Sequence, residues 1–126
     1  MRLSIRRVAV AACVVVLAAC AAASPEATVD SFDHLIEAGK YDQAYALLSS
    51  EARAMFPEAK MQVVMAEQSR KMKAAGGIKA INFSGLIVTG DTAKVTALTT
   101  LGNGTKSTDT VRLLRENGKW KIEMKK

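Results

Sequence analysis

The spacing of apolar residues changes once along the chain, at Gly76-Gly77. Before this pair, apolar residues recur every three or four positions, as at Val29, Phe32 and Ile36, which is the period of an amphipathic helix. From Ile78 onward apolar and polar residues alternate, which is the period of a strand. Helices that all precede short-linked strands predict an α+β domain. We expect N-terminal helices packed on one face of a curved antiparallel four-stranded sheet.

Three helical segments are predicted before the glycine pair. The first begins at Ser24-Pro25, because serine is a good N-cap and proline fits the first helical position, and it ends at Gly39. The second covers 41–48, and Ser49-Ser50 can cap a further turn. The third runs from 57 to 75. Its methionine-rich stripe indicates core packing, with a ligand groove as the alternative, and consists of Met61, Val64, Met65, Gln68 and Met72.

Four strands are predicted after it, at 78–89, 92–101, 108–116 and 119–126. The alternation is disturbed at Ser84-Gly85, as at a bulge, and Asn117-Gly118 is a strong hairpin signal. The expected inward residues of the last three strands carry no ionisable group: they are Ala93, Val95, Ala97, Thr99, Val111, Leu113, Trp120, Ile122 and Met124.

The N-terminal segment predicts export. Three arginines precede twelve uncharged residues at 8–19, too few to span a bilayer, which needs about 20. The run closes with Leu17-Ala18-Ala19-Cys20, which resembles the lipobox of bacterial lipoproteins, whose cysteine receives a diacylglyceryl group. We therefore expect a signal peptide at 1–19, lipidated Cys20 and a short tether at 20–24, and one domain at 25–126. The alternatives are ordinary cleavage after residues 21–23, or Cys13 as acceptor behind a hydrophobic core of five residues.

Export limits the partners and the chemistry. The full chain has a formal charge of +6, and residues 1–19 contain three arginines and no acidic residue. The mature chain is therefore only mildly basic, which does not indicate a nucleic-acid partner. The domain has one His and no cysteine beyond Cys20, so we expect neither an internal disulfide nor a metal site, and no cofactor. The expected location is the bacterial envelope. In a Gram-negative cell it is the outer membrane, because Ala21 follows Cys20 where an Asp is linked to inner-membrane retention.

Several motifs carry a resemblance to a known family. They are Val29-x-x-Phe32, the segment 37–48, Gly90-Asp91-x-Ala93-x-Val95 and the segment 111–122. They resemble small bacterial lipoproteins of unassigned function in the nuclear-transport-factor-2-like (NTF2-like, cystatin-like cone) superfamily. The resemblance implies a cone with a pocket between the concave sheet and the helices. The superfamily includes isomerases, dehydratases and noncatalytic binding modules, so the resemblance leaves the function open.

The predicted pocket residues are Tyr41, Tyr45, Met65 and Trp120. An isomerase-like or hydratase-like enzyme would need a carboxylate or His beside a Tyr in that pocket. On a helical wheel His34 points to water and Asp33 lies at the edge of the buried face. We therefore expect no catalytic residues and noncatalytic binding of a small apolar ligand or an envelope protein. The alternative is a small enzyme that uses a pocket carboxylate and a tyrosine.

The outward face of the sheet offers a second surface. Its residues could support a homodimer and are Thr92, Lys94, Thr96, Leu98, Thr100, Arg112 and Leu114. A basic stripe lies on the last strands, at Arg112, Lys119, Lys121 and Lys125. Such a stripe either protects an edge strand from pairing or contacts anionic lipid or cell-wall polymer.

Overall fold

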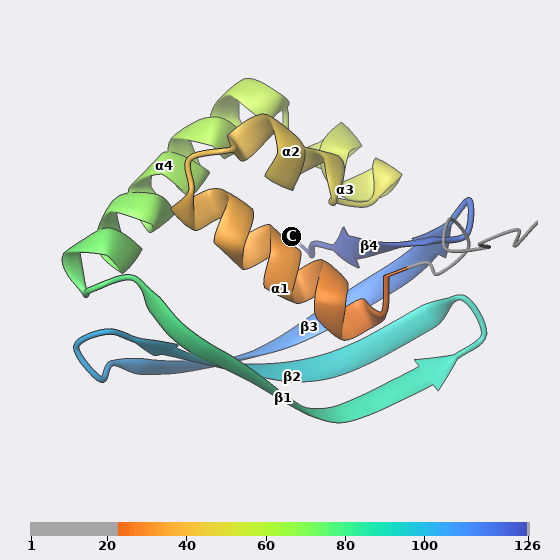
Figure 1. Cartoon of the computed structure of the whole chain (residues 1–126). Coiled ribbons are helices and arrows are strands. Elements are labelled where there is room, and N and C mark those ends of the chain that lie inside the picture. The colour runs from red at the N-terminus through yellow and green to blue at the C-terminus, as the bar shows by residue number, and fades with distance from the viewer. Residues whose placement is uncertain (1–22, 126) are drawn as a thin grey trace, which may run out of the picture.

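The computed structural model describes residues 23–125, so the predicted signal peptide, Cys20 and the first tether residues lie outside the described residues. Four helices come first: α1 Pro25–Glu37, α2 Tyr41–Ala46, α3 Ser50–Met55 and α4 Glu58–Ala74. Four strands follow: β1 Ile78–Thr89, β2 Thr92–Leu101, β3 Lys106–Glu116 and β4 Lys119–Glu123. The strands form one antiparallel sheet in the order β1-β2-β3-β4, and the helices cover one face of it (Figure 1). The predicted α+β fold is confirmed. No helix within residues 23–125 has the length and apolar character needed to cross a bilayer.

Two of the predicted helix starts, at Ser24 and Ser49, are confirmed by side-chain caps. The Ser24 hydroxyl accepts a hydrogen bond from the Ala27 N–H at 3.1 Å, and Pro25 follows as the first helical residue. The Ser49 hydroxyl caps α3 in the same way, through the Ala52 N–H at 3.1 Å. Each of these bonds satisfies a backbone donor that has no partner within its own helix.

The turns of the sheet follow the prediction as well. The β1–β2 register shifts between Ser84 and Ile87, where Gly85 has a φ of 63°, so the disturbed alternation is a bulge. Asn117 and Gly118 have φ values of 50° and 75°, the left-handed pair that a tight two-residue hairpin requires.

The last strand is shorter than predicted, because β4 ends at Glu123 rather than at 126. Its outer edge is occupied by the linker between α2 and α3. The Ile122 N–H donates to the Leu47 carbonyl and the Ser49 N–H donates to the Ile122 carbonyl, each at 2.8 Å. This short parallel bridge pairs backbone groups that an edge strand would otherwise leave free.

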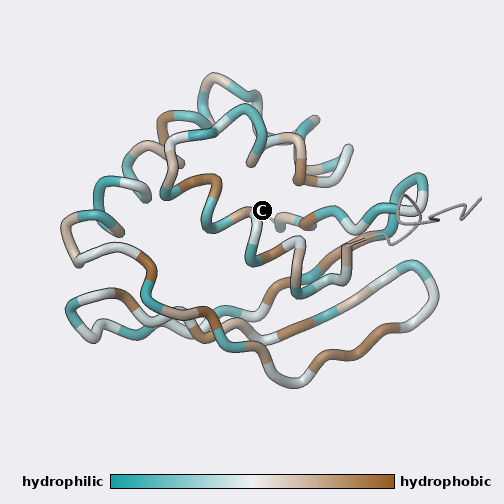
Figure 2. Tube along the Cα trace, in the orientation of Figure 1, coloured by the Kyte–Doolittle hydropathy of each residue, from teal (hydrophilic) through white to brown (hydrophobic). Residues whose placement is uncertain are grey.

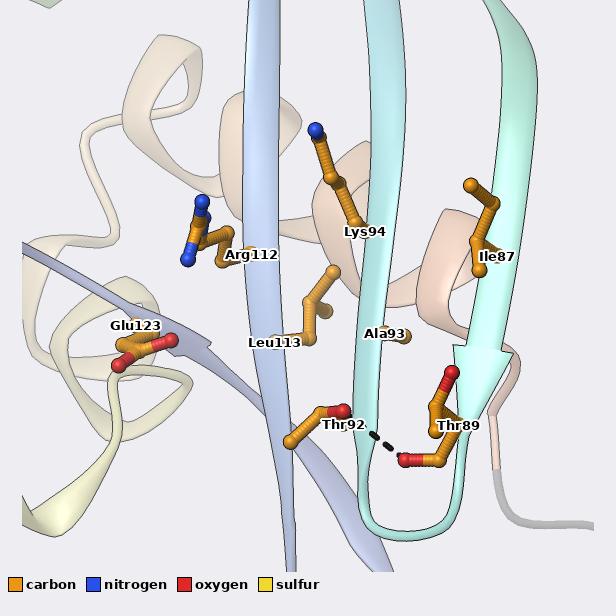
Figure 3. Close-up of a pocket in the computed structure, with 8 residues that line it drawn as sticks. All are labelled: Ile87, Thr89, Thr92, Ala93, Lys94, Arg112, Leu113 and Glu123. Carbon is orange, nitrogen blue, oxygen red and sulfur yellow. Dashed lines mark hydrogen bonds between the residues drawn. The ribbon is translucent and has the colours of Figure 1, made fainter.

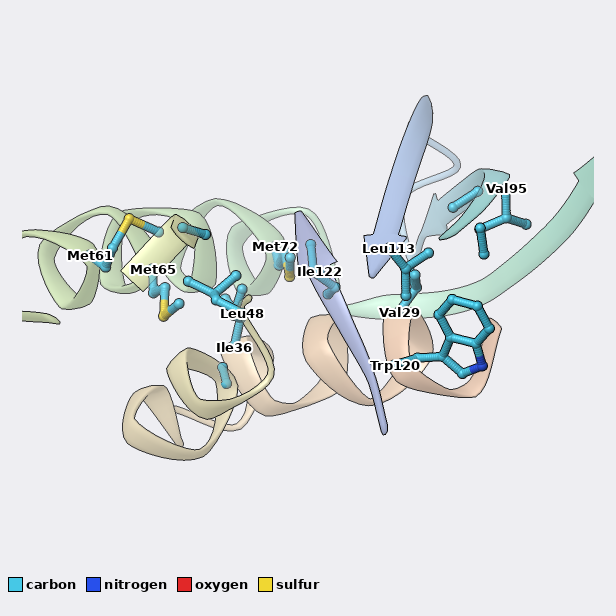
Figure 4. Packing of buried hydrophobic residues seen from close by; sticks show 14 residues of the cluster. Val29, Ile36, Leu48, Met61, Met65, Met72, Val95, Leu113, Trp120 and Ile122 are labelled. Atoms are coloured by element: carbon cyan, nitrogen blue, oxygen red, sulfur yellow. The ribbon is translucent and has the colours of Figure 1, made fainter. Parts of the chain in front are cut away.

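The core lies between α1, α4 and the concave face of the sheet. Leu48, Val95 and Leu113 have no exposed surface, and Val29 and Trp120 belong to the same buried cluster (Figure 4). The prediction that Val64 and Gln68 belong to the buried stripe of α4 is wrong, since Val64 is 58% exposed and Gln68 is also exposed.

The buried stripe of α4 is instead rotated slightly around the helix. It consists of Met61, Met65, Ser69 and Met72. The Ser69 hydroxyl donates to the Glu37 carbonyl at 3.3 Å, so this polar residue is satisfied where α4 packs on the end of α1.

Candidate functional site

A hollow of about 200 Å³ lies between α1 and the concave face of the sheet. Eight residues line it: Val29, Phe32 and Asp33 from α1, Ala97 and Thr99 from β2, Asp109 and Val111 from β3, and Ile122 from β4. Its walls are largely apolar, and its polar groups are two carboxyls and one hydroxyl. Ligand sites in proteins combine apolar walls with a few polar groups in this way. The hollow is smaller than a typical drug-sized site and suits a small molecule.

The α1 side of the hollow follows from helical spacing. Val29 and Asp33 are four residues apart, so both side chains project from the same face of α1. Val29 is 3% exposed, and the Asp33 side chain is partly buried. The predicted position of Asp33 at the edge of the buried face is therefore confirmed.

The sheet side of the hollow brings a carboxyl that the sequence analysis missed. Asp109 pairs with Ala97 in the β2–β3 register, and side chains of paired residues point to the same face of a sheet. Asp109 therefore faces α1, and the expectation that no inward residue of the last three strands is ionisable is wrong. The strand was predicted to begin at 108, and two steps back from inward Val111 reach Asp109. Alternation along the strand was thus a sufficient signal.

The surroundings of Asp33 favour its protonated form. Burial first, and then the negative charge of Asp109, raise the pKa of Asp33 to about 6, while Asp30 adds to the rise and His34 opposes it. Asp33 is therefore mostly ionised at pH 7 and takes up a proton in mildly acidic solution. His34 itself has a half-exposed side chain, 3.5 Å from the Asp30 carboxylate, which confirms that it points to water.

The four predicted pocket residues lie elsewhere. The Tyr45 hydroxyl donates to the backbone carbonyls of Arg53 at 3.0 Å and Phe56 at 2.9 Å, so it holds α3 against α2. Met65 is 2% exposed in the core, and Tyr41 packs partly buried against the same core. None of these three residues lines the hollow under α1.

Trp120 also belongs to the core, at 6% exposed. The guanidinium of Arg115 lies 4.4 Å from the centre of its ring, which is cation–π geometry. The indole is thus covered by Arg115 and does not line the hollow under α1.

A second hollow, of about 260 Å³, opens on the sheet near the β1–β2 turn. Figure 3 shows Lys94 and Arg112 standing on the side of the sheet away from the helices. Most of its lining residues are exposed, whereas Val29, Ala97 and Ile122 of the first hollow are buried. It therefore offers a ligand less enclosure than the hollow under α1. It lies within the surface predicted to form a homodimer, and that dimer stays a prediction.

Neither hollow contains the donor set that a metal needs. Within residues 23–125 no group of three or more His, Cys, Asp or Glu side chains is placed to hold a metal ion. Asp33 and Asp109 supply two carboxyls, and the site can therefore accept hydrogen bonds or exchange a proton.

The helices on one face of the antiparallel sheet and the hollow under α1 define an α+β cone. Residues 18–123 match the family described as a domain of unknown function, DUF4878, and the chain belongs to this family. No curated protein matches the sequence significantly.

Two solved structures show the same fold. One is the crystal structure of a protein from Campylobacter jejuni described as an NTF2-like transpeptidase. It is 24% identical with a TM-score of 0.71, over 82% of this chain and 100% of that chain. The other is the solution structure of a SEC-C motif containing protein from Rhodopseudomonas palustris, 18% identical with a TM-score of 0.55, over 86% and 82% of the two chains. At these identities the likeness concerns the fold alone.

Proposed function

We propose that the chain is a lipoprotein of the bacterial envelope, anchored through Cys20, whose NTF2-like domain binds a small ligand without catalysis. In a Gram-negative cell the anchor would lie in the outer membrane. The anchor is supported by the Leu17-Ala18-Ala19-Cys20 motif behind a short apolar run. The observation that carries the binding role is the hollow under α1.

The lining of the hollow indicates the chemistry of the ligand. An apolar body would contact Val29, Phe32 and Val111, and burial of that surface would drive association. The carboxylates of Asp33 and Asp109 accept hydrogen bonds, so the ligand should carry an N–H or O–H donor at that end. A fully apolar ligand would cover the partly buried Asp33 carboxylate without offering it a partner, which is costly.

Binding is favoured over catalysis by the groups that the hollow lacks. Isomerase-like chemistry was expected to pair a carboxylate with a tyrosine, and the Tyr45 hydroxyl already donates to two backbone carbonyls outside the hollow. Asp33 is an acceptor when ionised, which it mostly is at pH 7, so it does not replace a tyrosine donor there.

One observation favours a second candidate function. The raised pKa of Asp33, about 6, is close to neutral, and groups that exchange protons in catalysis often have such values. A small isomerase-like or hydratase-like enzyme would use Asp33 as the proton carrier, with burial and then Asp109 keeping its pKa high.

Native mass spectrometry of the protein isolated from its own membranes tests the binding role. We expect a copurified small molecule, and we expect the Ala97→Leu variant to lose it, because Ala97 is 3% exposed and its enlarged side chain would fill the hollow. Asp109→Asn should weaken retention, and exposed Asp42→Asn is the matched control. Circular dichroism of each variant checks that it folds. An empty wild-type protein, or equal retention by Ala97→Leu, would contradict the proposal.

The fate of the copurified small molecule distinguishes binding from catalysis. If it is chemically altered on incubation, and Asp33→Asn stops this while Asp42→Asn does not, the domain is an enzyme. If it is recovered unchanged, binding is supported.

The anchor is tested separately by intact mass. A diacylglyceryl mass that disappears in Cys20→Ser supports it, and an unlipidated chain that begins near Ser24 refutes it.

A further inference from the structure

Three consecutive apolar residues are exposed at the end of β1. Leu86, Ile87 and Val88 are 41%, 61% and 48% exposed. They follow the bulge at Gly85 and lie on an edge strand, since β1 pairs only with β2. Figure 2 shows this stretch as an apolar segment that extends beyond the helical layer. Exposed apolar residues in a continuous group indicate a contact surface more strongly than scattered ones do.

The start of α1 lies at the same end of the domain. The last residue of α1, Glu37, accepts a hydrogen bond from the Ile78 N–H at the beginning of β1. The helix is 13 residues long, or about 20 Å, so Pro25 lies toward the other end of the sheet, where β1 ends. Figure 1 shows the α1 start, the β1–β2 turn and the β3–β4 turn together at this end.

The chain length between the anchor and the domain restricts how far this end can lie from the membrane. Only residues 21–24 separate Cys20 from Pro25. A chain spans at most about 3.5 Å per residue, so the Cys20 Cα lies within about 18 Å of the Pro25 Cα. A lipid on Cys20, which is the anchor proposed above, therefore holds this end of the domain close to the bilayer.

The charges around the apolar residues are compatible with anionic headgroups. Ile87 pairs with Lys94, Lys94 with Arg112, and Arg112 with Glu123, so one row on the outer face holds two cations and one acid. At the β1–β2 turn the Asp91 carboxylate lies 3.9 Å from the Arg115 guanidinium, which reduces its repulsion of an anionic surface.

We propose that the hairpin patch, defined as Leu86, Ile87, Val88 and Lys94, rests on the membrane that holds the anchor. Val88 pairs with the inward Ala93 and Ile87 with the outward Lys94, so the apolar side chains lie on both faces of the strand. The end of the hairpin therefore enters the headgroup boundary edge-on, and Lys94 stays at the level of the phosphates. The β1–β2 turn is two residues past Val88, so shallow contact is enough to bring the patch into this layer. This inference rests on the proposed lipid anchor, and the membrane contact would fix the orientation of the hollow relative to the bilayer.

Site-directed spin labelling tests the docking. With Cys20 lipidated and the signal peptide removed, an Ile87→Cys substitution supplies the one free thiol of the mature chain, because the sequence has two cysteines and the other is Cys13. Val64→Cys is the matched control, since Val64 is also apolar and 58% exposed but lies on α4. Both labelled lipoproteins are reconstituted into vesicles of phosphatidylethanolamine and phosphatidylglycerol.

We expect the ratio of oxygen to nickel-chelate collisions to rise on reconstitution for the label at 87 and to stay constant at 64. Equal ratios at both positions, with a diacylglyceryl mass on Cys20, would overturn the docking and leave the anchor intact. Absence of that mass would overturn the anchor and the docking together. Spin–spin broadening at 87 would assign the patch to a second copy of the chain and would also overturn membrane docking.

Discussion

Replacement of Asp33 by Asn should stabilise the domain at alkaline pH. In the unfolded chain the Asp33 carboxyl titrates near 3.8, whereas in the folded chain burial and Asp109 raise its pKa to about 6. Between these pH values the folded protein holds a proton that the unfolded chain has lost. Stability therefore falls as pH rises through this window, and the loss is complete above pH 6.

The size of the expected stabilisation follows from the rise in the pKa of Asp33. About two pKa units at 1.36 kcal/mol each give at most about 3 kcal/mol, and partial access of water to Asp33 reduces this to about 2 kcal/mol. Because Asn stays neutral, Asp33→Asn should unfold with a free energy about 2 kcal/mol higher than the wild type at pH 8. At pH 3.5 the wild-type carboxyl is protonated in both states, so the two proteins should be nearly equal.

Urea unfolding, followed by the fluorescence of Trp120, the single tryptophan, measures the free energy of unfolding at each of the two pH values. Asp42→Asn is the control, because Asp42 is exposed and does not line the hollow. A gain of the same size at both pH values, or a loss of stability at pH 8, would show that the raised pKa does not reflect a cost of ionising Asp33.

Three further variants test the packing, the Glu116 contact and the hairpin. Leu113→Ala should lose about 3 kcal/mol in urea unfolding, because Leu113 has no exposed surface, and the partly exposed Leu98→Ala should lose clearly less. Glu116→Gln should lose about 1 kcal/mol at pH 7, since the Glu116 carboxylate accepts hydrogen bonds from the Ser50 N–H and hydroxyl, which lower its pKa. That loss should fade as the pH falls below 4.5, and a loss that persists in acid would refute the assignment. Gly118→Ala should cost about 1 kcal/mol in thermal unfolding, because Gly118 has a φ of 75°, and an unchanged midpoint would contradict this.

Much of the fold could be predicted because its determinants are local. The Ser24 and Ser49 caps depend on a donor three residues away, and the Asn117-Gly118 turn depends on two backbone conformations. The bulge at Gly85 was visible as a break in the alternation. Less could be predicted where two elements meet, as on α4, where Ser69 rather than Gln68 is buried.

In the candidate site, too, local features could be predicted from the sequence and contacts between distant elements could not. The predicted pocket residues Tyr41, Tyr45, Met65 and Trp120 are apolar or aromatic and suited to a binding site, but the same properties suit the core, which is where the structure places them. Asp33 and Asp109 are 76 positions apart in the sequence. Their proximity depends on which face of α1 lies on the sheet.

The sequence alone determined the order and type of the elements, the turn positions and the lipobox-like motif, because each depends on residues within a few positions of one another. The tertiary structure alone decided which stripe of α4 is buried and that Asp109 faces Asp33. It also decided that Leu86, Ile87 and Val88 are left uncovered. These features depend on the relative placement of helices and sheet, which follows from the packing of many distant side chains at once.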